Sequence, residues 1–172
     1  MVNCVYTAFR PRSGAENGCR GGWMYDVYNY MLQNDRGVKT EIQLGYTATY
    51  TPGCTTAQMG GPVKIKSYIE TPRYSCSAMK DMLHQGATSV ALCASGLRFY
   101  RSEVFANSYY CRPGCSVNHA VLAVGYTSEG DWILKNSWGR GWGLEGYFYM
   151  KGGNECEVCK YGSSLVLTHP AP

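Results

Sequence analysis

The stretch from Asn118 to Gly146 reads NHAVLAVGYTSEGDWILKNSWGRGWGLEG and contains two short apolar runs joined by a glycine-bearing turn. Such runs are typical of consecutive β-strands, here predicted at Val121–Tyr126 and Asp131–Asn136. His119 and Asn136 then fall at matching ends of the two strands. A histidine that acts as a base needs a partner that holds its ring in one tautomer, and a side-chain amide oxygen can do this. The stretch therefore predicts half of a nucleophilic catalytic site.

The composition predicts a folded globular chain. It has 172 residues, of which 45% are hydrophobic and 16% charged, enough for one substantial core or two small lobes. The formal charge of +4 comes from scattered Lys and Arg, so we expect no nucleic-acid partner. No apolar run approaches the roughly 20 residues of a bilayer span, so no membrane association is expected. Residues 1–14 also lack the apolar core of a signal peptide.

Nine cysteines are more than an ordinary cytosolic protein carries. They predict disulfides and an oxidising compartment, either extracellular or lysosomal and vesicular. Because the count is odd, at least one cysteine lacks a partner within the chain.

Helical spacing of apolar residues predicts one helix over Gly22–Asp35, and a second is predicted over Ser77–Gln85 with Ser77 as its N-cap. Strict alternation predicts a strand at Val63–Ile69. Further strands, as in a small barrel or a strongly bent sheet, are predicted at Thr88–Cys93, Val121–Tyr126, Asp131–Asn136 and Gly146–Met150. Residues 46–61 read as a loop, and a lobe boundary is expected near residues 60–62.

Six short segments carry a resemblance to a known family. Asn118-His119-Ala120, together with Lys135–Gly139 (KNSWG) and Gly141–Gly143 (GWG), closely resembles the segments around the catalytic histidine and asparagine of papain-like cysteine peptidases of the cathepsin L type. Glu16–Met24 (ENGCRGGWM) is similar to the family's cleft-lining Asn-Gly-Cys-x-Gly-Gly turn. Residues 86–94 and 97–105 are also similar, and the resemblance covers residues 2–167.

By this resemblance the fold is α+β with two lobes: an incomplete helical left lobe at residues 1–61 and a β-barrel-like right lobe at residues 62–172. The family's Cys-Gly-Ser-Cys-Trp motif, which carries the nucleophile, is not among the 172 residues. Val2-Asn3-Cys4 is similar to the family's Leu-Val-Asp-Cys, which follows that motif's helix. The expectation is a homologue or fragment that lacks the nucleophile segment and is inactive as an isolated chain, with a binding or structural role.

The resemblance also implies roles for single residues. His119 would be the catalytic base and Asn136 its orienting partner, with the indole of Trp138 covering their hydrogen bond. The alternative is a histidine kept only for packing in an inactive site. Peptide or protein substrates would be bound by Gly21, Gly22, Trp23, Met24, Val117, Asn118, Trp138 and Tyr161.

The family's cysteine pairs imply a bridge between Cys4 and Cys54, and another between a cysteine near the histidine and Cys156. The family partner of Cys19 lies in the absent segment, so Cys19 is the expected unpaired cysteine. Two bridges among Cys111, Cys115, Cys156 and Cys159 are expected, and Cys76 with Cys93 is a further candidate pair.

Four alternatives stay open. Cys93 or Cys19 would replace the nucleophile only if its thiol were activated. The spacings Cys111-x3-Cys115 and Cys156-x2-Cys159 resemble zinc knuckles, but the peptidase motif already uses two of these cysteines, so no metal or other cofactor is expected. The chain would otherwise be an active endopeptidase completed by a missing segment or a second chain, or a self-associating assembly protein similar to silica-associated relatives of the cathepsins.

Overall fold

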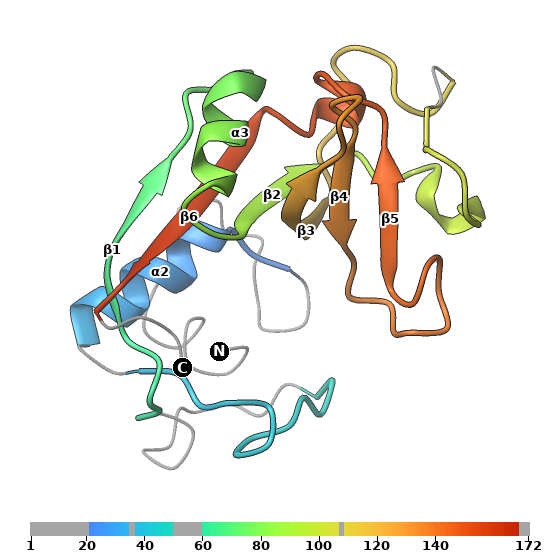
Figure 1. The fold of residues 1–172 in the computed structure, drawn as a ribbon. Coiled ribbons are helices and arrows are strands. Elements are labelled where there is room, and N and C mark those ends of the chain that lie inside the picture. The colour runs from blue at the N-terminus through green and yellow to red at the C-terminus, as the bar shows by residue number, and fades with distance from the viewer. Residues whose placement is uncertain (1–20, 35–36, 50–59, 107–108, 169–172) are drawn as a thin grey trace. The chain divides into compact units, whose positions relative to one another are not determined.

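The computed structural model describes residues 21–34, 37–49, 60–106 and 109–168 (Figure 1). These residues form two compact units: the first comprises the described residues up to Tyr68 and from Leu165 onward, and the second spans Ile69–Ser164. The lobe boundary expected near residues 60–62 stays a prediction. None of the helices in the described part of the chain is long and apolar enough to span a bilayer.

One six-stranded sheet runs in the order β1-β6-β2-β3-β4-β5. Four pairs with a defined register, β2 with β3, β2 with β6, β3 with β4 and β4 with β5, are antiparallel. The sheet and the helices confirm the α+β class. The strands are Ile65–Glu70 (β1), Thr88–Leu92 (β2), His119–Tyr126 (β3), Trp132–Lys135 (β4), Tyr147–Met150 (β5) and Tyr161–Leu167 (β6).

The sequence did not indicate β6, because its residues YGSSLVL place polar side chains at buried positions. Ser164 is buried, and its hydroxyl donates to the carbonyl of Ala87 at 3.1 Å. Burying a hydroxyl group that is hydrogen-bonded to the backbone costs little free energy. This strand therefore lies in the interior of the sheet although its sequence has no apolar run.

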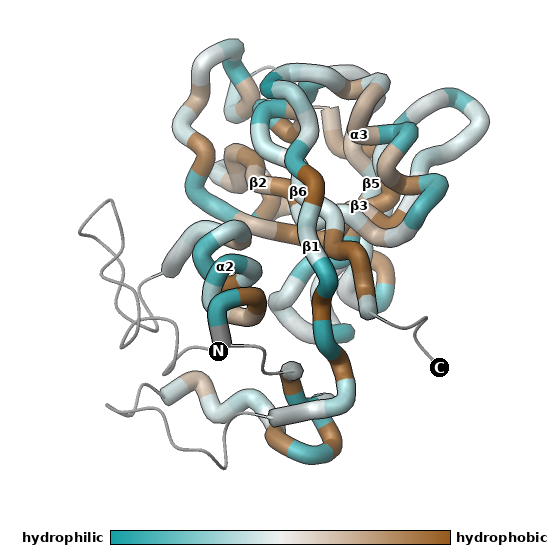
Figure 2. The backbone as a smooth tube through the Cα atoms, turned by 90° about the vertical axis from the view of Figure 1, so that its left-hand side faces the viewer, coloured by the Kyte–Doolittle hydropathy of each residue, from teal (hydrophilic) through white to brown (hydrophobic). Residues whose placement is uncertain are grey.

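In the second unit, helix α3 (Cys76–Leu83) packs against β2 and β3 (Figure 1). Met79 and Met82 of the helix are buried, and Figure 2 shows hydrophobic residues along β2 and β3. The predicted N-cap Ser77 is wrong: Ser75 caps the helix, and its hydroxyl accepts from the Ala78 amide at 3.3 Å. The side chains in this core with almost no exposure are Trp132, Phe148, Leu92, Leu97, Leu134, Met150, Val90 and Val158.

In the first unit, helix α2 (Met24–Asn34) confirms the helix predicted from residue 22. Tyr28 and Met31 of this helix form a small buried cluster with Ile65 of β1. Tyr68 donates a hydrogen bond to the amide oxygen of Asn29 at 3.2 Å, and its ring centroid lies 5.4 Å from that of Tyr28. The amphipathic pattern of α2 therefore packs one face of the helix onto β1.

Two disulfides lie in the second unit, Cys76–Cys159 and Cys111–Cys156. The implied bridge between a cysteine near the histidine and Cys156 is confirmed as Cys111–Cys156. The predicted pair of Cys76 with Cys93, and a second bridge within the set Cys111, Cys115, Cys156 and Cys159, are wrong. The reason is the turn before α3, where the Tyr74 amide donates to the Cys159 carbonyl at 2.8 Å and so brings Cys76 beside Cys159. The predicted Cys4–Cys54 pair and the unpaired Cys19 lie outside the described residues.

Candidate active site

The antiparallel pair β3 and β4 places His119 and Asn136 at one end of the sheet. His119 is the first residue of β3, and Asn136 directly follows β4. Leu122 pairs with Lys135, so the start of β3 lies beside the end of β4. The Asn136 backbone is held in turn by its amide, which donates to the Gly146 carbonyl at 2.9 Å. Two residues separated by 17 positions in the sequence therefore meet.

The side chains of these two residues are hydrogen-bonded. The Nε2 atom of His119 lies 2.8 Å from the Oδ1 atom of Asn136. The same oxygen accepts from the Ser137 backbone N–H at 2.8 Å, which fixes which atom of the amide is oxygen, since a backbone N–H can only donate. An amide oxygen only accepts, so Nε2 must carry the hydrogen. In the neutral ring, Nδ1 then has a free lone pair and can take a proton from a nucleophile.

Burial and aromatic packing protect this hydrogen bond. Asn136 is 8% exposed, and the Trp138 ring centroid lies 4.9 Å from that of His119 at an interplanar angle of 33°. The Trp142 ring meets Trp138 edge-on at 5.1 Å and packs in turn against Phe148 at 5.5 Å. A hydrogen bond shielded from water is electrostatically stronger, so this aromatic cover helps to hold the ring in one orientation.

The backbone entering β3 is fixed by Asn118. Its amide donates to the Leu92 carbonyl at 3.0 Å, and its side-chain oxygen accepts from the Ala94 amide at 2.9 Å. The end of β2 thus anchors the residue before His119 on both sides. This anchor and the Ser137 amide were not found from the sequence, because both depend on backbone groups that carry no residue signature.

The structure brings together only part of the predicted substrate-binding set. Asn118 and the half-buried Val117 directly precede His119 in the sequence, and the Trp138 ring centroid lies 4.9 Å from that of His119; all of these residues belong to the second unit. Tyr161 lies on β6, where its backbone pairs with Ala91 and its ring lies under the Arg73 guanidinium at 5.0 Å. The other predicted residues belong to the first unit, at the start of α2: Gly21, Gly22, Trp23 and Met24.

None of the cysteines in the described ranges is an activated nucleophile. Four are in disulfides, and Cys93 is buried. Burial, followed by a hydrogen bond with the Cys93 side chain, raises the pKa of Cys115 to about 12, so this thiol is protonated at neutral pH. Cys19, the other thiol considered from the sequence, lies outside the described residues.

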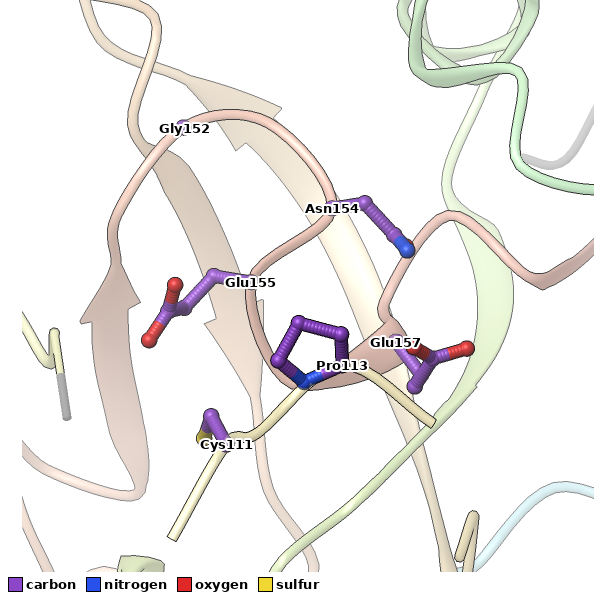
Figure 3. A pocket seen from close by; sticks show the side chains of 6 residues that line it. All are labelled: Cys111, Pro113, Gly152, Asn154, Glu155 and Glu157. Carbon is purple, nitrogen blue, oxygen red and sulfur yellow. The ribbon is translucent and has the colours of Figure 1, made fainter. Parts of the chain in front are cut away.

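The zinc-knuckle alternative is wrong, because Cys111, Cys156 and Cys159 are all in disulfides and offer no thiolate. Beside them lies a pocket of about 430 Å³. In Figure 3 the carboxyl groups of Glu155 and Glu157 point to opposite sides of the Pro113 ring, so they do not converge on one point. The pocket is lined by Cys111, Pro113, Gly152, Asn154, Glu155 and Glu157.

Comparisons by family, by sequence and by structure all match this chain to cysteine proteases. The family described as "Papain family cysteine protease" matches residues 1–166. The chain is 29% identical over 178 residues to "Cysteine proteinase 1" of Dictyostelium discoideum, covering 97% of this chain and 51% of that protein. It is 35% identical over 164 residues to "Cysteine proteinase 2" of Entamoeba histolytica, covering 92% of this chain and 49% of that protein.

A solved structure, that of the digestive procathepsin L2 proteinase from Tenebrio molitor larval midgut, superposes with a TM-score of 0.77 at 31% identity. The match covers 96% of this chain and 51% of that one. The chain thus spans about half the length of the curated relatives named above.

Proposed function

Because this chain belongs to the papain family of cysteine proteases, we propose that His119 is the general base of a peptidase site and that Asn136 holds its ring. The observation that carries this proposal is the 2.8 Å hydrogen bond between His119 Nε2 and Asn136 Oδ1. It leaves Nδ1 as the nitrogen that takes a proton. Peptides or proteins are the proposed substrate class.

In the proposed reaction, His119 Nδ1 removes the proton of a cysteine thiol, and the thiolate attacks a peptide carbonyl carbon. The imidazolium, stabilised by the Asn136 oxygen, then returns the proton to the leaving amine nitrogen. Water subsequently cleaves the acyl-thioester. None of the cysteines in the described segments is suited to be this nucleophile, and the sequence contains no Cys-Gly-Ser-Cys-Trp. The 172-residue chain alone is therefore proposed to bind peptides without cleaving them.

The test is an assay of the purified 172-residue chain with fluorogenic peptides. We expect no hydrolysis above the buffer rate. His84→Ala is the matched control for His119→Ala, because His84 bonds to Tyr126 on another part of the second unit. Hydrolysis by the pure chain that is lost in His119→Ala and kept in His84→Ala would show that a nucleophile is present and refute the proposal.

The second candidate is an active endopeptidase completed by another polypeptide. The amide orientation and tautomer at His119 favour it, since both fit an operating base. Adding a polypeptide that carries the Cys-Gly-Ser-Cys-Trp motif would then produce hydrolysis that depends on His119. Native mass measurement from the source separates the two candidates: a single species at 19.0 kDa contradicts a partner chain.

A third candidate is a self-associating protein. Apolar side chains on a turn of the first unit favour it: Ile42 is 98% exposed, Tyr46 71% and Leu44 44%. Exposed apolar groups close together commonly mark contact surfaces. A strictly monomeric chain in analytical ultracentrifugation would rule this candidate out.

The two disulfides fit an oxidising compartment. We propose an extracellular or lysosomal location on this basis. Substrate contacts are proposed for the residues named from the sequence, with the Trp138 indole as the contact next to His119.

A further inference from the structure

Three aromatic rings of the second unit form a contiguous row at the surface. Phe99 ends the short 3₁₀ helix Leu97–Phe99 (η3), and its ring centroid lies 6.1 Å from that of Tyr110. The Tyr110 ring meets the Tyr109 ring edge-on at 4.9 Å. Phe99 is 56% exposed and Tyr109 is 68% exposed. We call Phe99, Tyr109 and Tyr110 the aromatic row; exposed aromatic groups that lie together commonly mark a contact surface.

The fold holds the aromatic row in place. The Phe105 amide donates to the Tyr149 carbonyl of β5 at 2.8 Å, and the Phe105 carbonyl accepts from the Lys151 amide at 2.9 Å, so this segment runs beside β5 (Figure 1). Phe105 and Tyr110 both pack on Gly96, so closely that a Cβ atom added there would lie 2.8 Å from each side chain. The rings are therefore positioned before any partner binds, which reduces the entropy lost on binding.

An arginine stacks at each end of the aromatic row. The Arg98 guanidinium carbon lies 4.5 Å from the Phe99 ring centroid, and that of Arg112 lies 5.4 Å from the Tyr109 ring centroid. Both arginines are exposed. A guanidinium group that stacks on a ring keeps the N–H groups at its edge available for a carboxylate, which it binds through two parallel hydrogen bonds. The row thus has a carboxylate-binding group at either end of an apolar surface.

The surroundings of the aromatic row favour an acidic partner that also carries apolar side chains. Residues 96–112 contain three arginines and one acidic residue, Glu103. A hollow of about 340 Å³, lined by residues 99–106, adjoins the row at Phe99, and the exposed Val104 lies in its wall. A polypeptide carries carboxylates and apolar side chains in one segment, whereas an anionic polysaccharide has no apolar side chain to fill a hollow. A protein partner therefore fits this surface better than a sulfated glycan.

We propose that Arg98, Arg112 and the aromatic row form a docking surface for an acidic segment of another protein, in which carboxylates alternate with apolar residues. The carboxylates bind to the two guanidinium groups, and the apolar side chains lie on the Phe99 and Tyr109 rings. Tyrosine and arginine are among the residues that contribute most binding free energy at protein interfaces. This surface goes beyond the proposed peptidase site, because none of its residues belongs to the set proposed for that site.

The test measures the fluorescence anisotropy of a labelled peptide of alternating Glu and Leu residues, titrated with the full 172-residue chain. We expect saturable binding that weakens as salt is added, because both guanidinium groups are exposed. Arg98→Ala and Arg112→Ala should each weaken binding by about tenfold or more, the effect of losing a charge-assisted contact. The matched control is Arg73→Ala, since Arg73 also stacks on a ring, that of Tyr161, outside the aromatic row. It should leave binding unchanged.

Conservative variants separate recognition by the guanidinium group from attraction by charge alone. Arg98→Lys and Arg112→Lys keep the charge but lose the planar group, so they should bind almost as weakly as the alanine variants. Lysine variants that bind like the unmodified chain would overturn the proposal, and so would no binding of the peptide or binding of a heparin fragment in its place. Binding that is lost in Trp138→Ala but kept in the arginine variants would assign the peptide to the proposed peptidase site and overturn the proposal while supporting that site.

Discussion

Two histidines of the second unit are each hydrogen-bonded through Nε2, yet their surroundings differ. His119 bonds to the Asn136 amide oxygen at 2.8 Å, and His84 bonds to the Tyr126 hydroxyl at 3.1 Å. An amide oxygen only accepts, whereas a hydroxyl both donates and accepts. The His119 partner is buried, while the contact of His84 with Tyr126 is exposed. One contact fixes a tautomer and the other leaves it free, so of these two histidines His119 is the one that we propose as the base.

The largest effect on the free energy of unfolding is expected from the aromatic rings that support the hydrogen bond between His119 and Asn136. Phe148 is fully buried and packs edge-on against Trp142, which packs in turn against Trp138. Phe148→Ala should lower the free energy of unfolding by about 3–5 kcal/mol, the usual cost of a buried aromatic ring. Chemical denaturation measures this. Phe99, which is 56% exposed, is the control: Phe99→Ala should cost under about 1 kcal/mol.

The next largest effect on stability is expected when the hydrogen-bond partner of His119 is removed, and it is compared with removal of the partner of His84. Asn136→Ala removes the acceptor of both His119 Nε2 and the Ser137 amide, so the free energy of unfolding should fall by about 1–3 kcal/mol. Tyr126→Phe removes only the exposed hydroxyl beside His84 and should change it by less than about 0.5 kcal/mol. Equal losses in the two variants would mean that burial does not distinguish the two contacts.

A third prediction concerns Asp131, which precedes β4 at the end opposite Asn136. A hydrogen bond from the Gly152 amide, assisted by Lys151, lowers the pKa of this carboxyl. A lowered folded-state pKa means that the stabilisation is present above the unfolded value, about 3.9, and is lost as the pH falls through the folded value. Asp131→Asn should therefore flatten the loss of stability below about pH 4. If Asp131→Asn and the unmodified chain lose thermal stability equally as the pH is lowered below about 4, this prediction is contradicted.

The smallest effect on stability is expected at Trp138, whose side chain is 42% exposed. Trp138→Ala should cost under about 1 kcal/mol, yet it should speed the solvent exchange of the His119 Nε2 hydrogen by opening its aromatic cover. Exchange-sensitive NMR of the imidazole measures this. An exchange rate equal to that of the unmodified chain would show that the indole does not shield the hydrogen bond.

The sequence predicted the contact of His119 with Asn136 because strand periodicity and strand order alone place both residues at one end of an antiparallel pair. It did not predict β6, since the buried Ser163 and Ser164 interrupt the apolar pattern. The N-cap of α3 is Ser75, two positions before the predicted Ser77. The reason is that a contact distant in the sequence, from Tyr74 to Cys159, sets the turn before this helix.

The disulfide pairs were predicted least well, because they too depend on contacts between residues that are distant in the sequence. The spacing of Cys111, Cys156 and Cys159 allows several pairings, and tertiary packing of α3 and of the loop before β3 selects among them. Local patterns define strands and helices, whereas contacts between loops are set by the assembled fold.

The central claim, that Asn136 holds His119 ready to accept a proton at Nδ1, is tested most directly by ¹⁵N NMR of the imidazole rings at a pH where they are neutral. For His119 we predict a protonated Nε2 and an unprotonated Nδ1, with averaging between tautomers for His84. Asn136→Ala should bring the His119 spectrum to the averaged form. A hydrogen on Nδ1 of His119, or the same averaging for both histidines in the unmodified chain, would contradict the account.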